Sequence, residues 1–311
     1  MFVLRFFCCL LFVQAAGCVP EFDGPQTQAP SPDDGGLDVQ PRAGITIRVA
    51  TWNVRRFFDP TCDSGSCGGD EFEALPSQQE FEERADEIAA SIRSLEADVV
   101  LLQEVESQAC LDALSARLGD VFDVFLIGET RLPASLDTVV LSKGRVEDVR
   151  THRQDSFQLP EGGQTRFERE LLEVHVIIES KRVAVFTAHF KSKSNDDPSQ
   201  RLAEATRARE VVLGTAEEMG DALVVFGGDL NDTPGSDPLD ALELGGDLVR
   251  VAAELDPDSW THIFRGNIEA LDHLYHADGL GKHVAGSSQV RRDDGRFGGS
   301  DHAALLADFN L

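Results

Sequence analysis

The amino-acid sequence predicts a single α/β domain in which helices cover β-sheets. First, residues 222–226 form a short, β-branched apolar run bounded by turn residues, which is typical of a buried strand. Second, apolar residues recur at helical spacing from Glu80 onward. Third, predicted strands outnumber helices, and no internal repeat is visible. The order of elements favours neither a barrel nor a strict alternation of strands and helices.

In the first half of the domain, the hydrophobic pattern changes between period two and the helical period. Apolar and polar residues alternate over 45–53, whereas Phe81, Ala85 and Ile88 mark one face of a helix. The predicted elements, in order, are a strand at 45–53, a polar loop with two cysteines at 59–79, a helix from Glu80, a buried strand at 98–104, a helix at 108–118 and a strand at 122–127.

In the second half, a long helix precedes the buried strand at 222–226, which we call the central strand. Ser199 is expected to cap this helix, because serine side chains accept hydrogen bonds from the first turn. The predicted elements are a strand at 136–142, a hairpin of 171–179 and 183–190 around Ser180 and Lys181, a helix at 199–219, the strand at 222–226, a short helix at 237–244, a strand near 271–275 and a last strand at 303–309.

Residues 1–17 are predicted to be an export signal. Arg5 supplies a positive charge, and residues 6–13 are apolar but too few to span a bilayer. The sequence Ala-Ala-Gly-Cys that ends at Cys18 resembles a bacterial lipobox, which implies lipidation of Cys18. The alternative is simple cleavage and secretion. The expected location is therefore outside the cytoplasm, as a lipoprotein of the bacterial outer membrane or cell surface or as a secreted protein.

Residues 18–43 are predicted to be a flexible, acidic, proline-rich tether. Five prolines and five acidic residues lie between residues 19 and 42, and no hydrophobic period appears. Residues 44–311 contain no further boundary and are expected to form one domain. We expect a monomer that is attached to a membrane only through the N-terminal lipid.

The chain is strongly acidic, with 28 basic and 55 acidic residues and a net charge of −27. This balance argues against nonspecific polyanion binding through a broad basic face, although it allows a local basic groove. In an oxidising compartment, Cys62 and Cys67 could close a small disulfide loop and leave Cys110 free.

The segment after the central strand contains the residues that most strongly indicate a functional site. Gly227 and Gly228 are expected to turn the backbone tightly and to let it approach a ligand. Asp229 and Asn231 are two positions apart, so in an extended segment they would point into the same crevice. Hard oxygen ligands at a strand end suit Mg²⁺, Mn²⁺ or a phosphoryl group.

Similar polar groups end several other predicted strands. Each has an ordinary structural explanation on its own, such as a turn cap or a buried histidine with a satisfied hydrogen bond. Their order and their common position at strand ends indicate one functional site. The motifs are Thr-Trp-Asn53, Gln-Glu104-Val, His189-Phe-Lys-Ser-Lys, Gly-Asp229-Leu-Asn231, Leu-Asp272-His and Ser-Asp301-His302.

This ordered set resembles the endonuclease/exonuclease/phosphatase superfamily over about residues 45–311. It is most similar to the deoxyribonuclease-like, bacterial secreted nuclease branch. The resemblance implies a four-layer α/β/β/α sandwich of two mostly antiparallel sheets flanked by helices. It also implies a divalent cofactor, Mg²⁺ or Mn²⁺, with Ca²⁺ possible.

The resemblance further implies a role for each motif residue. Glu104 would be the main metal ligand, supported by Asn53 and Asp301. Asp229 and Asn231 would position the water and the phosphoryl oxygens. The remaining roles are His302 as general base or transition-state stabiliser, Asp272 as the group that orients it, and His189 as a second histidine near the phosphate.

Basic residues near these motifs predict a phosphate-binding patch. Lys191 and Lys193 would share a face of an extended segment and could join Arg55, with Arg201 and Arg207 nearby. The alternative is a solvated basic cluster that does not contact substrate.

The sequence thus predicts an exported, Mg²⁺-dependent phosphodiester hydrolase. It favours a nuclease that cleaves DNA or RNA. Water would attack phosphorus with help from a metal and a His/Asp pair. One alternative is a sphingomyelinase-like phospholipid hydrolase or a phosphomonoester hydrolase of the same fold. A catalytically silent surface binding module is the other.

Overall fold

A computed structural model describes residues 44–311 except 280 and 294–296. The predicted export signal, the tether and Cys18 lie outside the described residues. None of the helices in the described part is long and apolar enough to cross a membrane.

The first sheet has β1 at its centre. β1 pairs in parallel with β2, whereas its pairing with β17 and the remaining pairings of this sheet are antiparallel. The sheet order is β15 (Lys282–His283), β17 (Ala304–Asn310), β1 (Thr46–Phe57), β2 (Val99–Val105), β4 (Asp137–Ser142) and β3 (Val124–Gly128), with β16 (Gln289–Arg291) also on β17.

The second sheet has β10 and β9 at its centre, and these two strands are parallel while the other pairings are antiparallel. Its order is β11 (Leu248–Arg250), β14 (Asp272–Ala277), β10 (Leu223–Asp229), β9 (Lys181–His189), β8 (Leu172–Ile178) and β5 (Arg145–Thr151). Two small pairs are β6 (Phe157–Gln158) with β7 (Gln164–Thr165) and β12 (His262–Phe264) with β13 (Asn267–Glu269).

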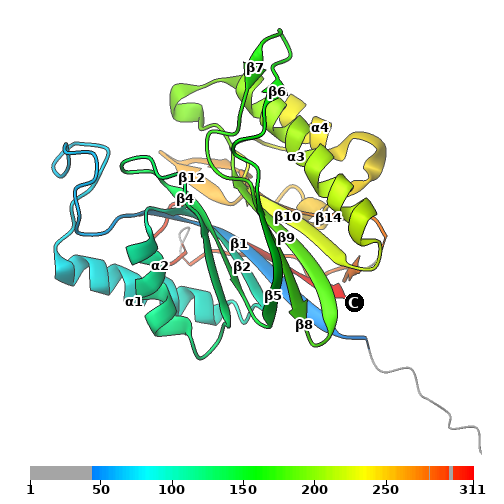
Figure 1. Cartoon of the computed structure of the whole chain (residues 1–311), viewed down its shortest axis with the longest axis horizontal. Coiled ribbons are helices and arrows are strands. Elements are labelled where there is room, and N and C mark those ends of the chain that lie inside the picture. The colour runs from blue at the N-terminus through cyan, green and yellow to red at the C-terminus, as the bar shows by residue number, and fades with distance from the viewer. Residues whose placement is uncertain (1–43, 280, 294–296) are drawn as a thin grey trace, which may run out of the picture. The chain divides into compact units, whose positions relative to one another are not determined.

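Helices cover the outer faces of both sheets (Figure 1). α1 (Gln78–Ser94) and α2 (Gln108–Leu118) pack on the first sheet, and α3 (Pro198–Met219) and α4 (Asp237–Glu243) pack on the second. Short 3-10 turns are η1 (Lys193–Asn195), η2 (Leu244–Gly246) and η3 (Val251–Leu255). The arrangement confirms the predicted four-layer sandwich.

Alternation along the strands builds three apolar layers. In β1, Ile47 and Val49 join the core between the sheets, whereas Ala50 and Trp52 join the core beneath α1 and α2. In β10, Val225 faces the other sheet and Phe226 faces α3 and α4. Both sheets are therefore buried on two faces, which explains their nearly continuous apolar sequences.

The helix starts follow capping chemistry, with one correction. Ser77 and Glu80 form a reciprocal capping box at the start of α1. The cap of α3 is Asp197, whose side chain accepts from the Gln200 N–H at 3.0 Å. The prediction of Ser199 as this cap is wrong, because Ser199 already lies in the first turn.

Gly227 and Gly228 are strand residues, so the predicted turn there is wrong. β10 continues through both glycines to Asp229 and pairs on both sides. Gly228 has φ 149°, and a Cβ at this position would collide with the Ala188 carbonyl oxygen. The glycines allow close approach of a neighbouring strand rather than of a ligand.

Candidate active site

The motif residues meet where the two sheets end. Asn53 extends the inward-facing row of Ile47 and Val49 on β1, and Asp229 extends the row of Val225 on β10. His189 and Asp272 are the register partners of Asp229 on the strands to either side. Period-two alternation therefore carries these polar side chains to the end of the core between the sheets.

A polar bridge joins the sheets just beneath this end. Gln103 Nε2 donates to Thr51 Oγ1 at 3.2 Å within the first sheet and to Thr187 Oγ1 at 3.1 Å on the second. All three residues have 0% exposure. A satisfied buried hydrogen-bond network is specific in geometry, so this bridge fixes how the two sheets meet below the site.

Asn53 links the two carboxylates that the sheets contribute. Its Nδ2 donates to Glu104 Oε1 at 3.2 Å and to Asp229 Oδ2 at 2.9 Å. Its Oδ1 accepts from the Arg55 N–H at 2.9 Å. Asn53 thus presents its amide nitrogen to the site, and its oxygen keeps one lone pair for a ligand.

Glu104 is held by a local irregularity of β2. Its φ is 66°, and the register with β4 shifts between Gln103 and Val105. The Arg56 N–H donates to Glu104 Oε2 at 2.8 Å. Each carboxylate oxygen accepts a single hydrogen bond and retains a lone pair.

Asp301, which directly precedes His302 in the chain, is paired with Arg55. Its Oδ2 lies 3.3 Å from Arg55 Nε. Glu104 and Asp301 offer hard oxygen ligands, which are those that Mg²⁺ and Mn²⁺ prefer. The donor chemistry of these carboxylates therefore suits a divalent cation, and the ligand atoms of Asp301, His262 and His302 lie within 4.8 Å of one another.

Asp272 and His302 form the tightest pair of the site. His302 Nδ1 lies 2.7 Å from Asp272 Oδ2, and Thr261 Oγ1 accepts the Asp272 N–H at 3.0 Å. Burial lowers the pKa of His302, but the charges of Asp272 and Asp229 raise it more, so its pKa lies above the ordinary value. The His302 imidazole is therefore held in its cationic form.

Asp229 lies between the two histidines. Its Oδ2 is 3.8 Å from His302 Nε2 and 3.6 Å from His189 Nε2. Burial raises the pKa of Asp229, and the Asp272 charge adds to the rise. Burial lowers the pKa of His189 far below its ordinary value, and the positive charges of Arg169 and His302 lower it further. His189 is therefore neutral.

Asn231 reaches the site by a different route from the one predicted. Its φ is 52°, so the segment after Asp229 is not extended. The Asn231 N–H donates to Asp229 Oδ1 at 3.0 Å, and its Nδ2 donates to the Phe190 carbonyl oxygen at 3.0 Å. The tight turn, rather than a shared strand face, places Asn231 beside Asp229.

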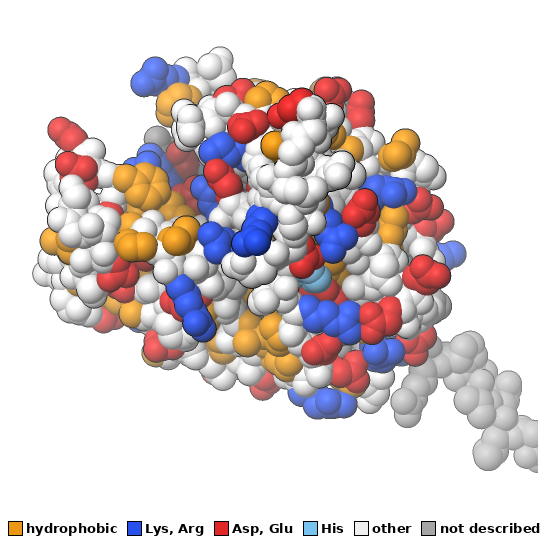
Figure 2. Space-filling view, turned by 45° about the horizontal axis from the view of Figure 1, so that its top comes forward, with side chains coloured by type: hydrophobic (Ala, Val, Ile, Leu, Met, Phe, Trp, Pro, Cys, Tyr) orange, Lys and Arg blue, Asp and Glu red, His pale blue; other side chains and the backbone are white. Residues whose placement is uncertain are grey.

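The predicted basic residues are paired with acids rather than gathered as free cations. Lys191 Nζ lies 2.7 Å from Glu168, and Lys193 Nζ lies 2.9 Å from Glu269. The remaining ion pairs are Arg201 with Asp232 and Asp196, Arg207 with Asp155 and Glu210, and Arg55 with Asp301. Figure 2 shows Lys and Arg side chains standing beside Asp and Glu side chains over one face of the molecule.

The expectation of one extended segment carrying both lysines is also wrong. β9 ends at His189, and Lys193 begins the turn η1. Among the five predicted basic residues, Arg55 has the most exposed side chain, at 46%. Arg55 and its neighbour Arg56 are thus the basic side chains best placed beside Glu104 and Asp301.

His262 is a residue of the site that sequence reasoning missed. It lies on β12, and its ring centroid is 4.5 Å from that of His302. Burial and the His302 charge lower its pKa. No motif marks His262 in the sequence, because the contact arises from an isolated bridge between residues 40 positions apart, His262 and His302.

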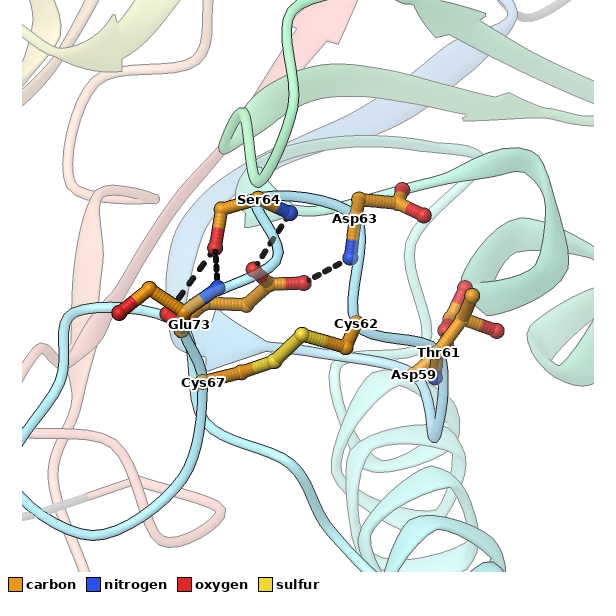
Figure 3. The surroundings of a disulfide bond; sticks show 8 residues. Asp59, Thr61, Cys62, Asp63, Ser64, Cys67 and Glu73 are labelled. Carbon is orange, nitrogen blue, oxygen red and sulfur yellow. Dashed lines mark hydrogen bonds between the residues drawn. A yellow bond between two sulfur atoms is a disulfide. The ribbon is translucent and has the colours of Figure 1, made fainter.

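Cys62 and Cys67 form a disulfide that closes the loop after β1 (Figure 3). Inside this loop, Glu73 accepts the N–H of Asp63 at 2.6 Å and that of Ser64 at 2.8 Å. Cys110 is buried, unpaired among the described residues, and burial raises the pKa of its thiol to about 12. Its reactivity is therefore low.

The two-sheet sandwich and the polar residues at its end are those of one protein family. Residues 50–302 match the sequence profile of the Endonuclease/Exonuclease/phosphatase family, and the chain belongs to this family. Members of the family typically hydrolyse phosphodiester bonds in a metal-dependent way. A comparison with curated protein sequences finds no match.

Several solved structures share the fold. Truncated TDP2 from Caenorhabditis elegans is 19% identical with a TM-score of 0.60, over 86% of this chain and 98% of that chain. The human nocturnin catalytic domain with a bound sulfate anion is 16% identical with a TM-score of 0.61, over 86% and 97%. Sphingomyelinase C from Streptomyces griseocarneus is 19% identical with a TM-score of 0.55, over 85% and 99%.

Proposed function

We propose that this protein is an exported, metal-dependent nuclease that hydrolyses phosphodiester bonds of DNA or RNA. The proposal is carried by the cluster in which His302, paired with Asp272, faces Asp229 at 3.8 Å. This cluster brings a cationic imidazole and a carboxylate to one small volume. Attack of water on a phosphodiester needs both a proton acceptor and a stabiliser of negative charge.

Glu104 is the main ligand that we assign to Mg²⁺ or Mn²⁺, with Asp301 beside it. An ion held there would supply positive charge for the phosphoryl oxygens of the ester. Asn53, which spans Glu104 and Asp229, fixes the distance between the ion site and the histidines. This contact favours a positioning role for Asn53, while its assignment as a further ligand stays a prediction.

The other residues have roles that follow from their protonation and contacts. His302 donates a hydrogen bond to the phosphoryl oxygens as their negative charge grows. Asp229 and Asn231 orient the attacking water, and Asp229 is placed to accept its proton. His189, which is neutral, can donate to the ester while its Nδ1 has no partner among the described residues.

Two exposed arginines support nucleic acid as the substrate. Arg55 and Arg56 are exposed residues near the end of β1, and the Arg56 N–H donates to Glu104. The Arg56 guanidinium lies 4.8 Å from the Phe72 ring centroid. Such a pair can bind a phosphate and a base together. A fold neighbour, Danio rerio TDP2, was solved in complex with a single-strand DNA product.

A phospholipid or small phosphoester is the second candidate substrate. The observation that favours it is that Lys191 and Lys193 are already neutralised by Glu168 and Glu269, which weakens attraction for a long polyanion. The fold likeness to sphingomyelinase C accords with it. In either case, we propose that Cys18 carries the lipid that anchors a monomeric enzyme outside the cytoplasm.

The experiment that tests the proposal measures turnover on several phosphodiesters. Plasmid DNA, RNA, sphingomyelin and a generic phosphodiester are each assayed with Mg²⁺, with Mn²⁺ and with EDTA. H302Q is the test variant. H283Q is its matched control, because His283 is a half-buried histidine that contacts Ser288 away from the site.

The expected result is cleavage of nucleic acid that requires a metal, survives in H283Q and is lost in H302Q. Cleavage of only the lipid or the small ester would keep the mechanism and replace the substrate. Folded, metal-binding protein without turnover on any substrate would overturn the proposal in favour of a binding module.

A further inference from the structure

The backbone that follows His189 is held by side chains. β9 ends at His189, and the Phe190 N–H still donates to the Asp229 carbonyl oxygen at 3.0 Å, which extends the pairing with β10. The Phe190 carbonyl oxygen accepts from Asn231 Nδ2 at 3.0 Å and from the Arg169 guanidinium at 3.3 Å. Side-chain contacts therefore fix the chain directly after the histidine.

The imidazole of His189 depends on this backbone for its orientation. It is 4% exposed, and its Nδ1 has no hydrogen-bond partner among the described residues. Its Nε2 lies 3.6 Å from Asp229 Oδ2, which is longer than a hydrogen bond. A ring without a hydrogen bond of its own is directed by packing and by the backbone that carries it.

Glu204, near the start of α3, supplies a further anchor for this segment. Its side chain is buried, and its Oε2 accepts the Lys191 N–H at 2.8 Å. Its Oε1 accepts the Glu168 N–H and Gln200 Nε2, each at 3.0 Å. Gln200 stands one helical turn before Glu204, so this contact sets the direction of the carboxylate. Glu204 therefore joins two chain segments that meet beside His189.

The segment of Glu168 contacts the same backbone from a second side. Arg169 follows Glu168 in the chain and donates to the Phe190 carbonyl oxygen. Lys191 Nζ also lies 2.7 Å from Glu168 Oε1. The two segments thus hold each other, and both are held by Glu204.

A carboxylate at this position is destabilising by itself. Glu204 forms no ion pair with a Lys, Arg or His of the described residues. Burial raises its pKa to about 7, although the hydrogen bonds from Glu168, Gln200 and Lys191 lower it. An apolar side chain would avoid the loss of hydration that a buried carboxylate suffers. What Glu204 adds is a pair of acceptors that faces three donors.

We propose that Glu204 is a positioning residue for His189. Its carboxylate fixes the Lys191 and Glu168 N–H groups and, through them, the direction of the His189 imidazole toward the ester. This inference rests on the proposed function, in which His189 donates to the ester. Glutamine in place of Glu204 would turn an NH₂ group toward one of these donors, so one N–H would lose its acceptor.

The first test is a double-mutant cycle. E204Q, H189Q and E204Q/H189Q are assayed on the substrate that the unmodified protein cleaves, at about pH 8, where Glu204 is ionised. We expect kcat to fall by about tenfold in E204Q with KM within about twofold, because a displaced donor loses part of its action on the developing charge. In the H189Q background, E204Q should lower kcat by less than about twofold. Equal losses in both backgrounds would overturn the proposal.

E173Q is the matched control. Glu173 is a buried carboxylate that also contacts α3, and its hydrogen bonds go to other residues, namely Thr215, His152 and His175. Both E204Q and E173Q should lower Tm by roughly 5 °C or more, but only E204Q should lower kcat. A kcat loss in E173Q equal to that in E204Q would assign the effect to stability alone and overturn the proposal.

Q200A replaces E204Q if that variant does not fold. It removes one of the donors that direct Glu204, so kcat should fall by about threefold. This loss should vanish in the H189Q background, and a loss that persists there would overturn the proposal.

The second measurement does not require turnover. The His189 ring resonances of the histidine-labelled full chain are assigned by their loss in H189Q. They should shift or broaden in E204Q, or in Q200A, and stay in place in E173Q. Unchanged His189 resonances in E204Q would overturn the proposal whether or not a phosphodiester is cleaved. Changed resonances in a protein without turnover would support the positioning of His189 and contradict the proposed function alone.

Discussion

Two places in the second sheet put a buried carboxylate beside imidazoles, but the pKa of the carboxylate is raised at one place and lowered at the other. At the catalytic end, Asp229 lies 3.6 Å from His189 and 3.8 Å from His302. On β8, Glu173 lies 2.7 Å from His152 Nε2 and 2.6 Å from His175 Nε2. Asp229 is 2% exposed and Glu173 is 0% exposed, so burial does not distinguish them.

The difference lies in how completely each carboxylate is satisfied. Glu173 also accepts from Thr215 at 2.9 Å and lies 3.4 Å from Arg150. Burial raises its pKa, but these hydrogen bonds and charges lower it more, to about 2. At the catalytic end, Asp272 Oδ1 and His189 Nδ1 have no described partners. A saturated network stabilises the fold, whereas an unsaturated one is left for substrate.

The largest expected effect is the loss of activity in H302Q. We expect kcat to fall by about 10²–10⁴-fold, because glutamine keeps a hydrogen bond to Asp272 but carries no positive charge. The free energy of unfolding should also fall, by about 2–4 kcal/mol, because the buried Asp272 carboxylate loses its cationic partner. Single-turnover cleavage and urea unfolding measure the two quantities. A large loss of stability with activity intact would contradict the comparison.

A different result for activity is expected for E173Q. Neutralising Glu173 removes the shared partner of His152, His175 and Arg150, so the free energy of unfolding should fall by about 2–4 kcal/mol. The kcat of the folded variant should stay within about twofold. Urea unfolding at neutral pH gives the first number. A drop in kcat similar to that of H302Q would show that the two clusters do not differ in kind.

The pH dependence of stability should separate the clusters as well. The folded-state pKa of Glu173 is about 2, below the unfolded value of about 4.5, so its contribution is complete above pH 4.5 and is lost as the pH falls toward 2. The pKa of His152 is raised above 6.5, so its contribution is complete below 6.5 and is lost as the pH rises through the folded-state value. The stability gap between the unmodified protein and E173Q should be largest between about pH 4.5 and 6.5, and a gap that stays flat would contradict this.

The smallest effect is expected at Lys193, which belongs to neither cluster. Its side chain is 35% exposed and paired with Glu269 at 2.9 Å. K193A should change the free energy of unfolding by less than about 0.5 kcal/mol and kcat/KM by less than about threefold. R55A is the comparison, with an expected increase in KM of about tenfold. An equal loss of kcat/KM in K193A would restore the lysine to the predicted phosphate-binding patch.

Much of the fold and the motif order could be predicted because both depend on local pattern. The strand at 98–104 has a continuous apolar run, and the candidate site residue Glu104 stands at its end. β5 could not be predicted, because it is an edge strand without a buried face and its residues do not alternate. In the sequence, Gly227 and Gly228 predict a turn, because the residues that require them to be glycine, Leu274 and Ala188, are distant in the chain.

The site was harder to predict where partners come from elsewhere in the chain. Lys191 resembles a free phosphate ligand until Glu168 is found 2.7 Å away. His262 has no motif, and only the pairing of β12 with the segment of His302 brings it to the site. Residue type and spacing predict which groups can react, whereas long-range contacts decide which of them are already neutralised.

The division of the catalytic cluster between the two sheets has a consequence for biogenesis. Asn53 and Glu104 belong to the first sheet, and His189, Asp229 and Asp272 belong to the second. A chain that has formed only one sheet therefore contains no complete centre. During refolding, recovery of the far-ultraviolet signal should precede recovery of turnover, which must wait until the sheets dock. Under the proposed function, a newly made chain gains the ability to cleave phosphodiesters only at that last step.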